Sequence, residues 1–141
     1  MYRALSERVA QLTGVVMVIG DTDTGKTSLS KVLAAESVKA GRTVAYIDAD
    51  IAASTVGSAA CVGLKILRDP ADFTDLATPD AMRFVGSTDP NGVVLPHVVA
   101  VASLVSQARS EADLIILDTT GVVAGVVGQT LKYHLAEITG P

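Results

Sequence analysis

The sequence has 141 residues, a length that indicates one domain, residues 1–141, with a core large enough to fold without disulfides or metal. Hydrophobic residues make up 49% and charged residues 18%, which excludes a disordered chain and is typical of a sheet buried on both faces. The formal net charge of −4 and the lack of Trp argue against a general positive field or a base-stacking platform for nucleic acid.

Apolar runs alternate along the chain with segments of helical period, the pattern of an α/β fold with a mainly parallel sheet flanked by helices. Short apolar runs predict strands at 15–19, 43–47, 82–85 and 114–117. Helical spacing predicts helices at 26–40, 94–109 and 128–137. Residues 51–63, rich in Ala, Ser, Thr and Gly, predict a loop or the start of a weak helix.

The predicted sheet is incomplete. The chain ends at Gly140 and Pro141, where an alternating α/β protein would add another strand, so the sequence predicts a fragment truncated at its C-terminus. The strands at 43–47 and 114–117 are expected on one side of the strand at 15–19, whose other edge would be open. Because open edges pair with other chains, we expect self-association.

The number of cysteines and the length of the apolar segments indicate the cellular compartment of the protein. Cys61 is the only cysteine, so no intramolecular disulfide can form, which favours a reducing compartment. No apolar run reaches the roughly 18 residues of a membrane span, and the N-terminus lacks the pattern of a signal peptide. We therefore expect a cytoplasmic protein without a membrane partner.

One motif carries the functional prediction. The segment that follows the first predicted strand and opens the first predicted helix fits G-x-x-x-x-G-K-[ST] at every fixed position. The predicted nucleotide-binding residues of this segment are Gly20, Asp21, Thr22, Asp23, Thr24, Gly25, Lys26, Thr27 and Ser28. The motif predicts the fold of a P-loop NTPase, with ATP and Mg²⁺ as cofactors.

The residue types of this motif have separate physical roles. Gly20 and Gly25 permit the backbone angles that turn successive amide N–H groups toward the β-phosphate. Lys26 brings a mobile charge to the β- and γ-phosphates and is a predicted catalytic residue, and the hydroxyl of Thr27 is placed to bind Mg²⁺. The carboxylates at positions 21 and 23 would be repelled by the phosphates, so both are expected to point away from them.

Two further strand ends carry carboxylates. Asp48 and Asp50 follow the second predicted strand and Asp118 follows the last one, at the carboxyl ends where α/β sheets bind their ligands. Because Asp48 and Asp50 alternate on extended chain, their side chains are expected on the same side. The pair is predicted to contact the metal through water and to accept a proton from the nucleophile, as catalytic residues. Asp118 competes for the metal, so the predicted metal site is Thr27, Asp50 and Asp118.

A glycine-containing loop follows Asp118. Thr119, Thr120 and Gly121 can bring a backbone N–H and a hydroxyl close to the γ-phosphate, so all three are predicted to bind the nucleotide. The sequence has no N-K-x-D motif for reading guanine. ATP is therefore favoured over GTP.

The order of these motifs resembles that of the polynucleotide 5′-hydroxyl kinase family of P-loop proteins, which includes an RNA 5′-kinase of pre-mRNA cleavage complexes and a ribosomal-RNA-processing kinase. The resemblance covers residues 15–131 and rests on GDTDTGKTSLS, YIDADIAASTVG, FVGSTDPNG and LIILDTTGVVAG. It implies transfer of the γ-phosphate of ATP to a 5′-hydroxyl end of RNA or DNA. By matched position, Asp48 and Asp50 would activate the hydroxyl, and residues 119–121 would brace the transferring group.

One departure from the family pattern bears on catalysis. After D-x-D the family continues with a hydrophobic or Pro residue and then Gly-Gln, whereas Ala52 and Ala53 follow Ile51 here. A Gln side chain can hydrogen-bond a nucleophile or a metal-bound water, and Ala cannot. The arginine-bearing lid of the family is also not found in the sequence. Nucleotide binding with weak or absent phosphoryl transfer is therefore predicted.

Two alternatives to a polynucleotide kinase remain open at this point. A D-T-x-G loop after a strand is also used by dimerising P-loop switches, driven by ATP or GTP, to sense the γ-phosphate. A nucleotide-binding module without chemistry would keep the phosphate loop and could carry Ala52 and Ala53. The kinase is the leading hypothesis of the three.

Overall fold

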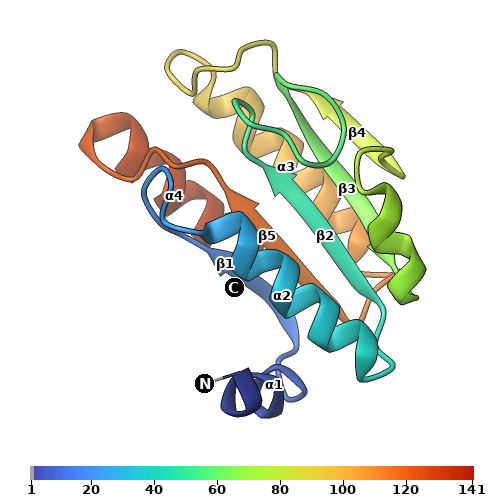
Figure 1. Ribbon diagram of the computed structural model, residues 1–141. Helices are drawn as coiled ribbons and strands as arrows, with labels where there is room; N and C mark the ends of the chain where they lie inside the picture. The colour runs from blue at the N-terminus through green and yellow to red at the C-terminus, as the bar shows by residue number, and fades with distance from the viewer. Residues whose placement is uncertain (1) are drawn as a thin grey trace.

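The computed structural model describes residues 2–141. Five strands form one sheet in the order β1-β5-β2-β3-β4 (Figure 1). The strands are β1 (Gly14–Val18), β2 (Val44–Ala49), β3 (Cys61–Leu67), β4 (Ala81–Phe84) and β5 (Leu114–Thr119). The helices are α1 (Tyr2–Val9), α2 (Lys26–Lys39), α3 (Val94–Ala108) and α4 (Gly125–Thr139), with a 3₁₀ helix at Pro70–Asp75.

The part of the sheet that leads to the phosphate loop is parallel. β5 pairs in parallel with β1 on one side and with β2 on the other. β3 is antiparallel to β2, and β4 is antiparallel to β3, so β3 alone runs against the other strands. The predicted α/β fold with a mainly parallel sheet is confirmed, and both β2 and β5 lie on one side of β1, as expected.

β3 corrects one prediction. The composition of residues 51–63 predicts a loop or a weak helix, whereas β3 begins at Cys61. Pairing with strands on both sides outweighs the weak local preference of this segment. Gly63 suits the strand because the preceding loop crosses directly over it: a Cβ there would lie 2.3 Å from the carbonyl oxygen of Val56.

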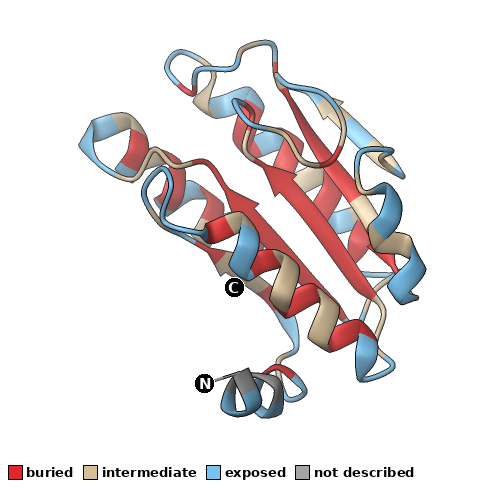
Figure 2. Ribbon diagram, viewed as in Figure 1, coloured by how far each residue is buried: buried red, intermediate tan, exposed pale blue. Residues whose placement is uncertain are grey.

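Helices cover both faces of the sheet (Figure 1). α2 packs on one face against β5 and β2, while α3 and α4 pack together on the other. Alternation along β2 supplies both cores, because Ala45 and Ile47 pack into the cluster with α3 and α4, and Val44 and Tyr46 pack into the cluster with α2. Every residue of β2 and β5 is buried in consequence (Figure 2).

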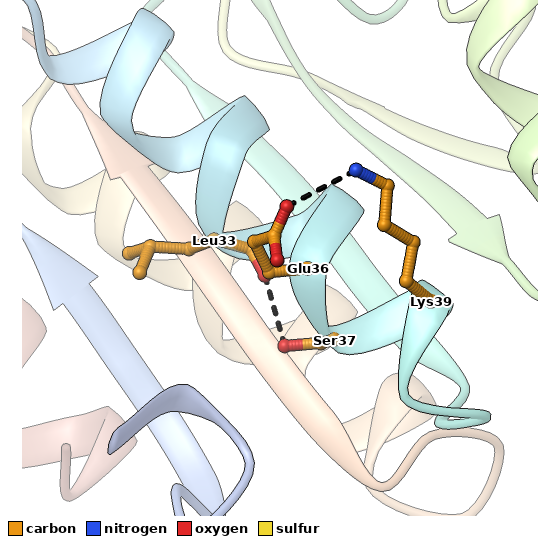
Figure 3. Close-up of polar contacts among 4 residues, drawn as sticks. All are labelled: Leu33, Glu36, Ser37 and Lys39. Carbon is orange, nitrogen blue, oxygen red and sulfur yellow. Dashed lines mark hydrogen bonds and ion pairs between the residues drawn. The ribbon is translucent and has the colours of Figure 1, made fainter. Parts of the chain in front are cut away.

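α2 fits against the sheet through small and polar residues as well as apolar ones. The buried hydroxyl of Ser37 donates to the carbonyl of Leu33 at 2.9 Å, so it needs no partner from the sheet (Figure 3). On the solvent side, Lys39 pairs with Glu36 at 3.1 Å, an exposed ion pair of small energetic value (Figure 3). Within residues 2–141, every helix falls short of the length and apolarity that a bilayer crossing requires.

A buried histidine on α3 holds the end of β2. His97 has no exposed surface, and its Nε2–H donates to the carbonyl of Ala49 at 2.8 Å. Burial lowers the pKa of His97, because the charged imidazolium would lose its hydration. The ring is therefore a neutral donor that ties α3 to the strand end next to Asp50.

This burial predicts a loss of stability in acid. In the unfolded chain His97 takes up a proton near its ordinary pKa of about 6.5, while the folded chain resists protonation, so the unfolded state binds more protons and is favoured as pH falls. Denaturant unfolding between about pH 7.5 and 5.5 measures the effect. The loss of stability that comes from protonation of His97 should vanish in His97→Gln. It should persist in His134→Gln, a control on the exposed side of α4. An unchanged profile in His97→Gln would contradict the prediction.

Candidate nucleotide-binding site

The phosphate loop connects β1 to α2 at the carboxyl end of the parallel strands, as predicted (Figure 1). Asp23 (φ 59°) and Gly25 (φ 87°) adopt left-handed backbone, which turns the loop back on itself. Lys26 folds over the loop and donates from Nζ to the carbonyl of Asp21 at 3.0 Å. A Cβ at Gly20 would lie 3.1 Å from Cγ of Lys26, so glycine leaves room for this side chain.

A cavity of about 380 Å³ opens over this loop. Its wall is formed by the loop, the start of α2 and residues that follow β2 and β5. The lining residues are Thr22, Asp23, Gly25, Lys26, Thr27, Ser28, Asp50, Ala53 and Gly121. An ammonium group and the N-terminus of a 14-residue helix meet in this cavity, a combination that suits a chain of phosphates.

Some of the predicted nucleotide-binding residues shape the loop instead of lining the cavity. The carboxylate of Asp21 accepts the N–H of Thr22 at 2.7 Å, and the hydroxyl of Thr24 donates to the carbonyl of Asp21 at 2.7 Å. Asp21 is not among the lining residues, in agreement with the expectation that it points away from the phosphates. Asp23 does contribute to the cavity wall, which differs from that expectation.

Asp118, in β5, joins the sheet to the phosphate loop. Its Oδ2 accepts hydrogen bonds from the hydroxyl of Thr27 at 2.8 Å and from that of Tyr46 at 3.0 Å. Its Oδ1 is buried and has no hydrogen-bond partner among residues 2–141. Burial raises the pKa of Asp118. Burial and the nearby carboxylate also raise the pKa of Tyr46, so its hydroxyl remains a donor.

These oxygens fit a Mg²⁺ ion carried by a nucleotide. Mg²⁺ takes oxygen ligands, keeps several of its waters and is usually held by one or two carboxylates together with phosphates. The unpartnered Oδ1 of Asp118 can accept from such a water, and the Thr27 hydroxyl lies beside the same carboxylate. Within residues 2–141 no group of three or more His, Cys, Asp or Glu forms a metal cage, so phosphate and water would complete the ligand set.

The structure separates Asp48 from Asp50, which corrects the expectation that they share a side. Asp48 is buried, and its carboxylate accepts backbone N–H groups from Asp50, Thr55 and Val56. Strand alternation stops applying because β2 ends at residue 49 and the chain turns. Burial raises the pKa of Asp48 to about 6, and these N–H donors oppose that rise. Asp48 therefore holds the loop that follows β2, and Asp50 alone of the pair lines the cavity.

The loop after β5 contributes Gly121 to the cavity. Thr119, predicted to bind the nucleotide, instead donates from its buried hydroxyl to the carbonyl of Val18 at 2.7 Å and ties β5 to β1. A Cβ at Gly121 would lie 2.5 Å from Oγ1 and 2.9 Å from the backbone nitrogen of Thr22. The glycine therefore lets this loop contact the phosphate loop directly.

A second cavity of about 300 Å³ adjoins the first. The two cavities share four lining residues, Thr22, Asp50, Ala53 and Gly121. The other residues that line the second cavity are Ala52, Thr88, Asp89, Pro90, Thr120 and Val122. Its lining includes the carboxylates of Asp50 and Asp89 and no lysine or arginine.

Two residues of the site escaped the sequence patterns. Tyr46 supports the carboxylate of Asp118, as described above, and Lys132 of α4 donates from Nζ to the carbonyl of Thr120 at 2.6 Å. Burial lowers the pKa of Lys132 to about 8. The available signal was the position of Lys132 next to Leu131 on the buried face of α4, where a lysine requires a polar partner.

Comparison with known proteins places this arrangement in a family. The family model described as mRNA cleavage and polyadenylation factor CLP1 P-loop matches residues 20–141, which begin at the first glycine of the phosphate loop. The chain belongs to the CLP1 P-loop family. The resemblance inferred from the order of the motifs is thereby confirmed.

Relatives of this chain include proteins that are named as kinases of RNA 5′-hydroxyl ends. A polyribonucleotide 5′-hydroxyl-kinase of Pyrococcus horikoshii is 33% identical over 138 residues, covering 96% of this chain and 38% of that protein. A polyribonucleotide 5′-hydroxyl-kinase of Pyrococcus abyssi is 38% identical over 128 residues, covering 89% of this chain and 35% of that protein. A CLP1 homolog of Drosophila sechellia is 28% identical over 149 residues, covering 99% of this chain and 35% of that protein. The chain therefore spans 35% to 38% of the length of these relatives.

Proposed function

We propose that this chain binds ATP with Mg²⁺ and transfers the γ-phosphoryl group to the 5′-hydroxyl end of a polynucleotide. The observation that carries the proposal is the position of Asp50, which borders both cavities. A nucleotide seated on the phosphate loop would direct its γ-phosphate toward the shared wall, and an acceptor in the second cavity would approach from the other side. In-line phosphoryl transfer requires such an arrangement.

Each residue of the site has a role in this reaction. Lys26 holds the β- and γ-phosphates. The hydroxyl of Thr27 and, through a water, the carboxylate of Asp118 would hold the Mg²⁺ ion. Mg²⁺ held there would offset the negative charge of the transferring phosphates. Asp50 orients the acceptor hydroxyl and takes its proton as the oxygen bonds to the γ-phosphorus and ADP leaves. Asp48 is less suited to that step, since loop amides occupy both of its oxygens.

The charge of the second cavity supports a hydroxyl acceptor. A 5′-phosphate there would face two carboxylates, Asp50 and Asp89, without a cation in the cavity wall. A 5′-hydroxyl is neutral and can donate a hydrogen bond to Asp50. The names of the Pyrococcus relatives, polyribonucleotide 5′-hydroxyl-kinases, agree with this choice.

Incubation with Mg²⁺ and γ-labelled ATP tests the proposal, with RNA or DNA oligonucleotides that carry a 5′-hydroxyl or, as a control, a 5′-phosphate. Label should enter only the 5′-hydroxyl oligonucleotides, and Asp50→Asn should reduce transfer by about 100-fold or more while ATP still binds. Label released as free phosphate would instead indicate a nucleotide-driven switch. ATP left unreacted would indicate a binding module.

The rate of phosphoryl transfer by the unmodified chain should be low. Ala53 lines both cavities and Ala52 lines the second, so neither can hydrogen-bond the acceptor or a metal-bound water. The double variant Ala52→Gly, Ala53→Gln should raise the rate in the same labelling assay. Rapid transfer by the unmodified chain would show that these positions do not limit the reaction.

We also propose that the isolated chain self-associates through β1. In the sheet formed by residues 2–141, β1 is an edge strand whose one neighbour is β5. An exposed strand edge presents unpaired N–H and C=O groups to other chains. Light scattering at about 100 μM, within the range in which such edges associate, should therefore detect dimers or larger species. A uniform monomer would contradict this expectation.

A further inference from the structure

We propose that Lys132 is a positioning residue that aims the backbone N–H of Gly121 at the γ-phosphate, an inference that rests on the proposed nucleotide site. Lys132 lies on α4 and is only 9% exposed. Its Nζ donates to the carbonyl of Thr120 at 2.6 Å, a short charge-assisted hydrogen bond. This contact fixes the loop immediately before the glycine that lines the cavity.

The geometry of one peptide unit links Lys132 to the cavity. The carbonyl of Thr120 and the N–H of Gly121 belong to the same planar unit, and residues 2–141 contain no cis peptide bond. In a trans peptide these two groups point in opposite directions. Lys132 holds the carbonyl on the side of α4, so the N–H of Gly121 is directed to the other side. Gly121 lines the cavity over the phosphate loop, where a γ-phosphate would accept that N–H.

The charge of Lys132 also belongs to this site. The ammonium of Lys26 repels that of Lys132, whereas the carboxylates of Asp50 and Asp118 attract it. A buried ammonium is costly without such neighbours, and a contact between helix and loop could be made by an uncharged side chain. The cation therefore fits a place where phosphate charge collects.

Binding of a nucleotide with and without a γ-phosphate distinguishes two roles of Lys132, positioning of the Gly121 N–H and general packing of α4 against the loop. ADP ends at the β-phosphate, which the phosphate loop holds through its own amides and Lys26. The N–H of Gly121 would contact only the additional phosphate of ATP. Loss of the Lys132 contact should therefore weaken binding of an ATP analogue and leave ADP binding largely unchanged, whereas a general packing role would affect both.

Calorimetry with Mg²⁺ and either ADP or the non-hydrolysable analogue AMP-PNP tests this inference. Lys132→Met keeps a flexible apolar stem without the donor, and Lys132→Arg restores donor and charge. The wild-type chain should prefer AMP-PNP. Lys132→Met should lose about tenfold of that preference with ADP affinity within about twofold of wild type, and Lys132→Arg should keep most of it. The control is Lys39→Met, in the last turn of α2, at the other end of the helix from the phosphate loop. Its side chain pairs with Glu36 (Figure 3).

Several results would overturn the inference. Retention of the preference by Lys132→Met, or an equal loss of affinity for ADP and AMP-PNP, would assign Lys132 a structural role. A wild-type chain that binds both nucleotides equally would remove the role of Gly121 but leave nucleotide binding, while one that binds neither would overturn the proposed function as well.

A second measurement applies if circular dichroism shows that Lys132→Met is unfolded. In the wild-type chain labelled with ¹⁵N-glycine, the amide resonance of Gly121 should shift with AMP-PNP and not with ADP. An unmoved resonance would overturn the inference.

Discussion

Replacing Lys26 by alanine should remove most of the affinity for ATP and leave the fold intact. Lys26 lines the first cavity and its Nζ lies 3.0 Å from a carbonyl of the phosphate loop, where it would meet the β- and γ-phosphates. Hydrogen bonds to charged groups contribute about 1.5–3 kcal/mol, which corresponds to a loss of affinity of roughly tenfold to more than a hundredfold. Alanine has the highest helix propensity, so the first turn of α2 should still form.

Calorimetric titration with Mg²⁺ and ATP measures the loss, and circular dichroism checks the fold. Lys39→Ala is the matched control, because it removes the same charge from the opposite, solvent-exposed end of α2. Equal binding of ATP by Lys26→Ala and the wild-type chain would mean that the phosphate loop is not a nucleotide site.

Replacing Gly63 by alanine should destabilise the chain by about 3 kcal/mol or more. The new Cβ would lie 2.3 Å from the carbonyl oxygen and 2.9 Å from the carbonyl carbon of Val56, and neither backbone atom can move without shifting the loop. Two backbone N–H groups of this loop, those of Thr55 and Val56, hydrogen-bond Asp48, so displacing it would also disturb the turn that presents Asp50 to the cavities.

Urea unfolding of the wild-type chain and Gly63→Ala measures the change in the free energy of unfolding. Gly92→Ala is the control: its φ of 79° is strained for alanine, but a Cβ there would meet no atom within 4 Å. Left-handed strain alone costs about 1–2 kcal/mol. A loss at Gly63 no larger than that at Gly92 would show that the loop does not press on β3.

Features whose cause is local could be predicted from the sequence. The phosphate loop, from Gly20 to Thr27, is set by glycine conformations and by the start of a helix, all within one short segment. The buried strands β2 and β5 are continuous apolar runs because both faces of the sheet are covered. The apolar run of each strand stops at an aspartate, and Asp50 and Asp118 could be placed at the carboxyl ends of the strands from that local change alone.

Tertiary structure decided which of these polar residues face the cavities. Asp48 and Asp50 are two residues apart in the sequence, but the turn after β2 gives one to the loop amides and the other to the site. β3 forms through pairing with β2 and β4, which local composition does not record. Lys132 meets Thr120 because α4 packs back toward the sheet, and Thr27 meets Asp118 across 91 residues. Periodicity predicts that a helix or strand exists, whereas the partner of a buried polar group depends on packing between elements distant in the chain.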